Sequence, residues 1–126
     1  MSEYRVLLVD DEEELVSTLV ERLEYRGFSA SYCTNGQDAL KMLREESYNV
    51  VVVDLKLPGM SGVDLLQTIR TAYPHLPVLM VTGHGAGGND GFQPPDGAFA
   101  FLVKPINIDE LVAKMTEAIK AYEPGQ

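Results

Sequence analysis

At 126 residues, with 45% hydrophobic side chains and a net charge of −9, the chain is long enough for one domain with a sizeable buried core. The acidic balance argues against a nucleic-acid-binding surface, because such a surface needs a basic face to meet phosphate groups. No apolar run approaches the roughly 20 residues of a membrane span and no signal peptide opens the chain, so we expect no membrane association and a cytoplasmic setting.

Four apolar runs predict strands, at residues 6–9, 50–53, 78–81 and 99–103. Uninterrupted runs of this kind are typical of parallel strands that are buried on both faces. Residues 29–33 are the expected second strand in chain order. The single cysteine, Cys33, ends this strand and has no partner for an internal disulfide. We therefore expect it to be a small buried side chain in a reducing compartment.

Amphipathic patterns between these runs predict helices. The first helix stops at Gly27, and Thr34 with Gln37 has the pattern of a capping box for the second. Ser61 is the expected N-cap of the third helix and Asn107 that of the last. The residues expected to face the core are Leu15, Val16, Leu19, Val20 and Leu23; Ala39, Leu40 and Leu43; Leu65, Leu66 and Ile69; and Ile108, Leu111, Val112, Met115 and Ile119.

The regular alternation of strands and helices predicts an α/β fold. Its expected form is a doubly wound three-layer sandwich around one five-stranded parallel sheet. No linker, repeat or low-complexity block divides the chain. We therefore expect a single domain over residues 1–126.

Polar side chains directly follow four of the predicted strands. Asp10 and Asp11 come after the first, Asp54 after the third, Thr82 after the fourth and Lys104 after the fifth. Ligands of such sheets bind beyond the carboxyl ends of the strands, where the strand order reverses, so these groups are expected to meet. Crowded carboxylates need a cation or a proton to neutralise them. Ligands that are all oxygen suit Mg²⁺, with Mn²⁺ as a substitute.

Asp54 is the candidate nucleophile because it follows the central strand. A carboxylate that attacks phosphorus forms an aspartyl phosphate. Lys104 would supply positive charge to the phosphoryl oxygens, and Thr82 a hydroxyl donor. The acidic run from Glu12 to Glu14 has a plainer explanation, since the helix dipole favours carboxylates in the first turn of a helix.

The chain resembles the receiver domain of two-component response regulators over nearly its whole length. The matching motifs stand in the family's order and at its spacing: Asp10-Asp11, Asp54 in the run DLKLPGMSG, Thr82, and Lys104-Pro105. The resemblance implies a flavodoxin-like sheet with strand order 2-1-3-4-5. It also implies a phosphorelay module that takes a phosphoryl group from the phosphohistidine of a histidine kinase onto Asp54, with Mg²⁺, and changes its surface for downstream signalling. Such a module is no enzyme beyond its own phosphorylation and dephosphorylation.

The resemblance also implies roles for single residues at the metal site. Asp11, Asp54 and the backbone carbonyl of Lys56 would ligate the metal. Asp10 would assist, either directly or through a water molecule.

Switch residues follow from the same resemblance. Thr82 and Lys104 would bind the phosphoryl group, and Phe101 stands at the position of an aromatic that moves with the threonine. For Phe101 a core aromatic on an edge strand is the alternative. The Lys104-Pro105 peptide bond is expected to be cis, which costs only about 0.5–1 kcal/mol before proline.

The segment between the last two strands departs from the family pattern. The family has a fourth helix there, whereas residues 85–97 of this chain are rich in glycine and proline. Glycine costs about 1 kcal/mol and proline about 3 kcal/mol in a helix interior relative to alanine. We therefore expect this helix to be replaced by, or reduced to, a Gly/Pro-rich loop.

Two side chains are candidates for tuning the lifetime of the phosphoryl group. Lys56 and His84 lie two residues after Asp54 and Thr82, where side chains flank the path of an attacking water. The alternative is that both are exposed loop residues, which is the preferred interpretation of His75.

Two other classes of protein share parts of this pattern. A flavodoxin-like FMN electron carrier needs a phosphate-binding loop after the first strand, but residues 10–14 are all acidic and would repel the phosphate. A metal-dependent phosphatase with an aspartyl nucleophile usually has a second Asp two residues later as general acid, where this chain has Lys56.

The expected partners are a sensor histidine kinase or phosphotransfer domain, and a downstream output domain or protein. Direct nucleic-acid binding is not expected of this domain. The chain is either a stand-alone regulator or the receiver part of a longer regulator or hybrid kinase, and the sequence leaves both open.

Overall fold

The structure, a computed structural model, describes residues 4–83 and 96–122. The strands are β1 (Arg5–Val9), β2 (Ser29–Cys33), β3 (Val50–Asp54), β4 (Val78–Thr82) and β5 (Ala100–Val103). The helices of the described residues are α1 (Glu13–Tyr25), α2 (Gly36–Glu45), α3 (Gly62–Ala72) and α4 (Ile108–Tyr122). The predicted Gly/Pro-rich loop falls mostly on residues 84–95, which lie outside the described residues.

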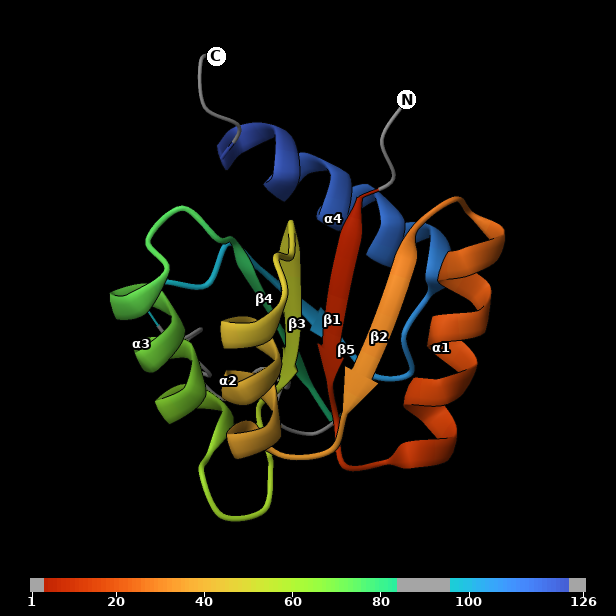
Figure 1. Ribbon diagram of the computed structural model, residues 1–126. Helices are drawn as coiled ribbons and strands as arrows, with labels where there is room; N and C mark the ends of the chain where they lie inside the picture. The colour runs from red at the N-terminus through yellow and green to blue at the C-terminus, as the bar shows by residue number, and fades with distance from the viewer. Residues whose placement is uncertain (1–3, 84–95, 123–126) are drawn as a thin grey trace.

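The five strands form one parallel sheet in the order β2-β1-β3-β4-β5 (Figure 1). This confirms the α/β fold and the strand order that the resemblance implies. The central strands β1, β3 and β4 are almost entirely buried, as their continuous apolar runs predict. The chain reverses direction across the sheet between β1 and β3, so the carboxyl ends of these two strands flank the switch point.

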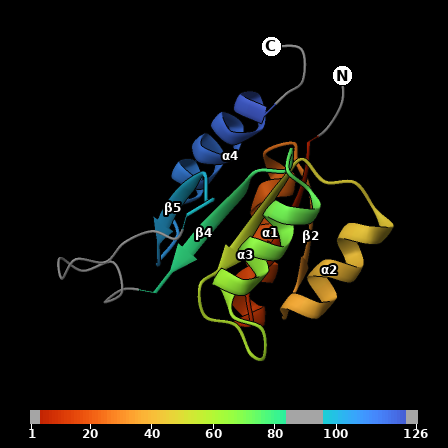
Figure 2. The same cartoon turned by 90° about the vertical axis from the view of Figure 1, so that its left-hand side faces the viewer.

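Helices cover both faces of the sheet and form two cores. On one face, α1 and α4 pack against alternate strand residues, and on the other α2 and α3 pack against the residues between them (Figure 1 and Figure 2). The alternation is that of β-strands, whose successive side chains point to opposite faces. None of the described helices has the length and apolar character that a membrane crossing requires.

Cys33 lies buried in the core between the sheet and α2. Burial raises the pKa of its thiol to about 11. The side chain therefore behaves as a small hydrophobic group, as predicted, because a reactive cysteine needs an accessible thiolate.

The predicted helix ends are correct at three places and wrong at one. Gly27, with φ +92°, closes α1 through bonds from its N–H to the Glu24 carbonyl and from the Phe28 N–H to the Leu23 carbonyl. This is the Schellman arrangement expected of a glycine after a helix. The side-chain oxygens of Ser61 and Asn107 accept the N–H groups three residues later, at the starts of α3 and α4.

The capping box predicted from Thr34 and Gln37 is wrong by one residue. Asn35 is the N-cap of α2, and its side-chain oxygen accepts the N–H of Asp38 at 2.8 Å. The Asn35 amide in turn donates to the Asp38 carboxylate at 3.0 Å. Asparagine is a better N-cap than threonine, and this reciprocal pair fixes the helix start one residue later.

Gly62 allows α3 to begin directly against the end of β3. A Cβ atom at this position would lie 2.3 Å from the backbone oxygen of Asp54 and 2.8 Å from Cα of Leu55. The Gly62 N–H also donates to the Leu55 carbonyl at 3.0 Å. The first turn of α3 therefore touches the backbone that carries Asp54.

We expect Gly62→Ala to destabilise the fold by about 3 kcal/mol, because the new methyl group would overlap fixed backbone atoms. This outweighs the roughly 1 kcal/mol that alanine gains over glycine in a helix. Urea unfolding measures the difference. Gly83→Ala is the matched control, since no atom of the described residues lies within 4 Å of its added Cβ, and it should change stability by no more than about 0.5 kcal/mol. Equal stabilities of the two variants would contradict the close approach.

Candidate metal and phosphoryl site

The register of the sheet brings the polar strand ends together. Val9 pairs with Val53, so Asp10 and Asp54 lie side by side as β1 and β3 end. Thr82 pairs with Val103 at the ends of β4 and β5, which places Lys104 at the same edge. The side chains of Asp10, Asp54 and Lys104 share a strand face by the two-residue period, and Thr82 belongs to the opposite face.

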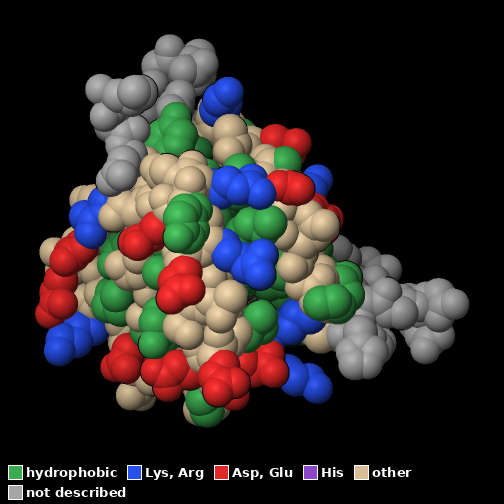
Figure 3. Space-filling view, turned by 90° about the vertical axis from the view of Figure 1, so that its right-hand side faces the viewer, with side chains coloured by type: hydrophobic (Ala, Val, Ile, Leu, Met, Phe, Trp, Pro, Cys, Tyr) green, Lys and Arg blue, Asp and Glu red, His purple; other side chains and the backbone are tan. Residues whose placement is uncertain are grey.

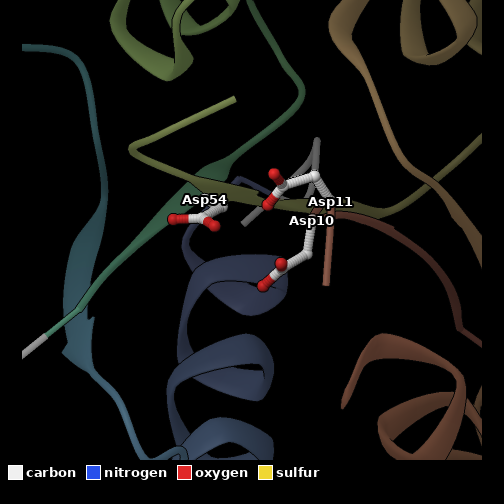
Figure 4. A group of neighbouring side chains, drawn as sticks. All are labelled: Asp10, Asp11 and Asp54. Carbon is white, nitrogen blue, oxygen red and sulfur yellow. The ribbon is translucent and has the colours of Figure 1, made fainter. Parts of the chain in front are cut away.

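Asp10, Asp11 and Asp54 each offer one carboxylate oxygen, and these three atoms lie within 4.8 Å of one another. Figure 4 shows the three side chains gathered at the carboxyl ends of β1 and β3. Asp10 and Asp54 are buried, whereas Asp11 is exposed. The predicted convergence of the carboxylates is therefore confirmed. An all-oxygen set of three carboxylates fits a hard divalent cation such as Mg²⁺.

The ammonium group of Lys104 lies among these carboxylates. Its Nζ is 3.0 Å from Oδ2 of Asp10 and 3.2 Å from Oδ2 of Asp54. Burial works against the ammonium form, but hydrogen bonds to Glu12 and Asp10 and the charges of Asp10 and Asp54 outweigh it. The pKa of Lys104 therefore lies above its ordinary value, and the side chain is charged at neutral pH.

Backbone N–H groups hold the two buried carboxylates in place. Oδ1 of Asp10 accepts the N–H of Glu12 at 2.9 Å, and Oδ1 of Asp54 accepts the N–H of Lys56 at 3.2 Å. Burial and the nearby Asp54 raise the pKa of Asp10, although the Glu12 N–H and the Lys104 ammonium oppose that shift. The carboxylates of Asp10, Asp11 and Asp54 together carry more negative charge than the ammonium of Lys104 neutralises. This excess favours a bound cation.

Glu12 is a site residue that the sequence analysis missed. The carboxylates of Glu13 and Glu14 lie in the first turn of α1, as predicted. Glu12 precedes that turn, and its carboxylate forms an ion pair with Lys104 at 2.5 Å. The explanation by helix dipole alone is therefore incomplete for Glu12. The contact joins residues 92 positions apart, and no local sequence pattern signals it.

The switch candidates Thr82 and Phe101 lie on β4 and β5, which follow β3 in the sheet. Thr82 is buried at the end of β4, and its hydroxyl donates to the Gly83 carbonyl at 3.4 Å. Phe101 is partly buried against the core between the sheet and α2 and α3. The Lys104-Pro105 peptide bond is cis, as the resemblance implies.

An open cleft of about 730 Å³ leads to the site and is lined by Asp11, Glu12, Asp54, Lys56, Gly83 and Lys104, among others. Lys56 is exposed at its rim. His84 lies outside the described residues, and His75 is exposed, as expected. In Figure 3 acidic side chains gather along the lower edge of the molecule, the end at which the strands finish in Figure 1.

Comparison with known proteins places these features in a family. The sequence matches the response regulator receiver domain family over residues 6–116. It is 36% identical over 120 residues to an NtrX-like response regulator of Rickettsia conorii, covering 94% of this chain and 25% of that protein. It is 34% identical over 121 residues to the DNA-binding transcriptional regulator NtrC of Escherichia coli, covering 96% of this chain and 26% of that protein. The chain thus spans about a quarter of the length of these relatives.

Solved structures agree with this placement. A CheY-like response regulator receiver domain protein from Methanospirillum hungatei superposes with a TM-score of 0.87 at 30% identity, covering 99% of this chain and 100% of that one. The response regulator TrrA of Thermotoga maritima, in complex with Mg²⁺ and BeF, superposes with a TM-score of 0.80 at 30% identity, covering 91% and 98%. The chain therefore belongs to the receiver domains of two-component response regulators.

Proposed function

We propose that Asp54 accepts a phosphoryl group in a Mg²⁺-dependent reaction. The domain would receive this group from a sensor histidine kinase or a phosphotransfer domain and pass the signal to an output domain or protein. The observation that carries the proposal is the position of Lys104, whose Nζ lies 3.2 Å from Oδ2 of Asp54 beside the three converging carboxylates. A carboxylate, a fixed cation and a metal-binding set stand together as phosphoryl transfer requires.

The transfer exchanges one bond for another. A carboxylate oxygen of Asp54 forms a bond to phosphorus while the bond from phosphorus to the imidazole nitrogen of the donor breaks. The electron pair of the broken bond leaves with that nitrogen. Lys104 faces the oxygens on which charge accumulates, and the Lys56 N–H holds the other carboxylate oxygen of Asp54 at 3.2 Å.

The metal ligands we assign are the carboxylates of Asp10, Asp11 and Asp54 and the backbone carbonyl of Lys56. All are oxygen donors, which suits Mg²⁺ and allows Mn²⁺ as a substitute. When bound, the ion neutralises the carboxylates and stabilises the phosphoryl oxygens.

We assign secondary roles to the residues around this centre. Thr82 would turn its hydroxyl from the Gly83 carbonyl to the phosphoryl group, and Phe101 would follow it. Lys56 and His84 would tune the access of water. We assign residues 1–126 to one receiver domain in the cytoplasm, whose only catalysis is its own phosphorylation and dephosphorylation.

Incubation with a small phosphodonor such as acetyl phosphate and Mg²⁺ should add one phosphoryl group, detected by intact mass measurement. Asp54→Asn should abolish the addition because its amide is a poor nucleophile. Asp64→Asn is the matched control: Asp64 is an exposed carboxylate in the first turn of α3, outside the cluster, and the variant should be labelled like the wild type. Full labelling of Asp54→Asn would overturn the assignment.

Mg²⁺ should raise the melting temperature, because a ligand that binds only the folded state stabilises it. At ten times its Kd the gain is about 1.4 kcal/mol. Asp11→Asn should raise the melting temperature in metal-free buffer by relieving repulsion, and should shrink the Mg²⁺ effect. Asp11 suits this test better than Asp54, which also pairs with Lys104. Differential scanning calorimetry of wild type, Asp11→Asn and Asp64→Asn measures both effects, and three identical responses to Mg²⁺ would speak against the ligand set.

A further inference from the structure

The Lys104 ammonium has no spare hydrogen bond for a phosphoryl group. An ammonium carries three N–H donors. In this structure three carboxylates, those of Asp10, Glu12 and Asp54, lie within ion-pair distance of Nζ. A phosphoryl oxygen that binds Lys104 must therefore displace one of them.

The three carboxylates differ in how easily they leave. The side chains of Asp10 and Asp54 are each 7% exposed, and a backbone N–H holds each carboxylate. The Glu12 side chain is 60% exposed, and Lys104 is the only hydrogen-bond partner of its carboxylate among the described residues. Water can take over the bonds of an exposed carboxylate at little cost, whereas a buried one loses partners that water does not replace.

Glu12 also stands at the place where a phosphoryl group enters. It lines the same open cleft as Asp54 and Lys104. A phosphoryl group on Asp54 would bring further negative charge to the same ammonium, so that Glu12 and the phosphoryl oxygens compete for it.

We propose that Glu12 is a positioning residue that acts through Lys104: it occupies the ammonium in the resting domain and yields it to the phosphoryl group. The proposal rests on the proposed function of Asp54 and Lys104. It predicts that the domain binds a phosphoryl group less tightly than it would without Glu12. Part of the binding energy is used to break the ion pair.

The test uses beryllofluoride as the phosphoryl mimic, titrated into the whole chain at saturating Mg²⁺ and followed by isothermal titration calorimetry. Glu12→Gln should lower the Kd for beryllofluoride by about two- to five-fold, the range that an exposed ion pair accounts for. The Kd for Mg²⁺ alone should stay within about two-fold, because Glu12 is not one of the assigned metal ligands and salt screens its exposed charge. High salt should shrink the advantage of the variant, because salt screens an exposed pair.

Glu14→Gln is the matched control. It removes the same charge from the first turn of α1, where Glu14 is exposed and forms no ion pair among the described residues. It should leave the Kd for beryllofluoride at the wild-type value. An equal gain in Glu14→Gln would show a general charge effect and overturn the proposal.

Two failures are distinguishable. If wild type and Glu12→Gln bind beryllofluoride equally, or the variant binds it more weakly, the role of Glu12 is wrong while the proposed function stands. If the wild type binds no beryllofluoride at all in Mg²⁺, the proposed function itself fails.

A double-mutant cycle in urea checks the resting state independently. Glu12→Gln, Lys104→Met and the double variant should show that Glu12 and Lys104 stabilise each other before any phosphoryl group is present. Additive effects of the two substitutions would mean that the ion pair has no energetic weight, and this too would overturn the proposal.

Discussion

The ion pairs of the Lys104 ammonium at the carboxyl end of the sheet hold together carboxylates that would otherwise repel one another. Asp10 and Asp54 are buried there, with Nζ of Lys104 3.0 Å and 3.2 Å away. Burying charges is costly unless they are paired and hydrogen-bonded. One lysine does not neutralise the whole set, and the remaining negative charge makes the site ready for a divalent cation. The same ammonium would face the oxygens of a phosphoryl group on Asp54, so one constraint links the stability of the fold to the proposed chemistry.

The sheet and its helices supply the rigid frame for this centre. The parallel register ends β1 and β3 at the same level, and the absence of a side chain at Gly62 lets α3 begin against the backbone of Asp54. Two buried cores on opposite faces fix the strands that carry the charged groups. The positions of these charged side chains therefore depend on packing far from them, because a small movement of a strand end would change the ion pairs of Lys104.

The sequence predicts the site residues that follow one repeated pattern, a polar side chain after a buried strand. It does not predict a residue whose place in the site depends on a single contact with a distant part of the chain. Asp10, Asp54 and Lys104 each follow a buried run, and parallel topology alone predicts that they converge. The ion pair between Glu12 and Lys104 joins the segment after β1 to the segment after β5, and no local pattern encodes this contact. The predicted start of α2 was one residue too early, because Thr34 and Asn35 both suit an N-cap. Only the reciprocal bonds between Asn35 and Asp38 decide between them.

The most direct measurement is a crystal structure of the domain with Mg²⁺ and beryllofluoride. The account predicts the beryllium on a carboxylate oxygen of Asp54, the metal among Asp10, Asp11 and Asp54, and a fluorine against Nζ of Lys104 with Glu12 turned to solvent. Beryllofluoride bound at any other residue, or a Lys104 that makes no contact with it, would contradict the account.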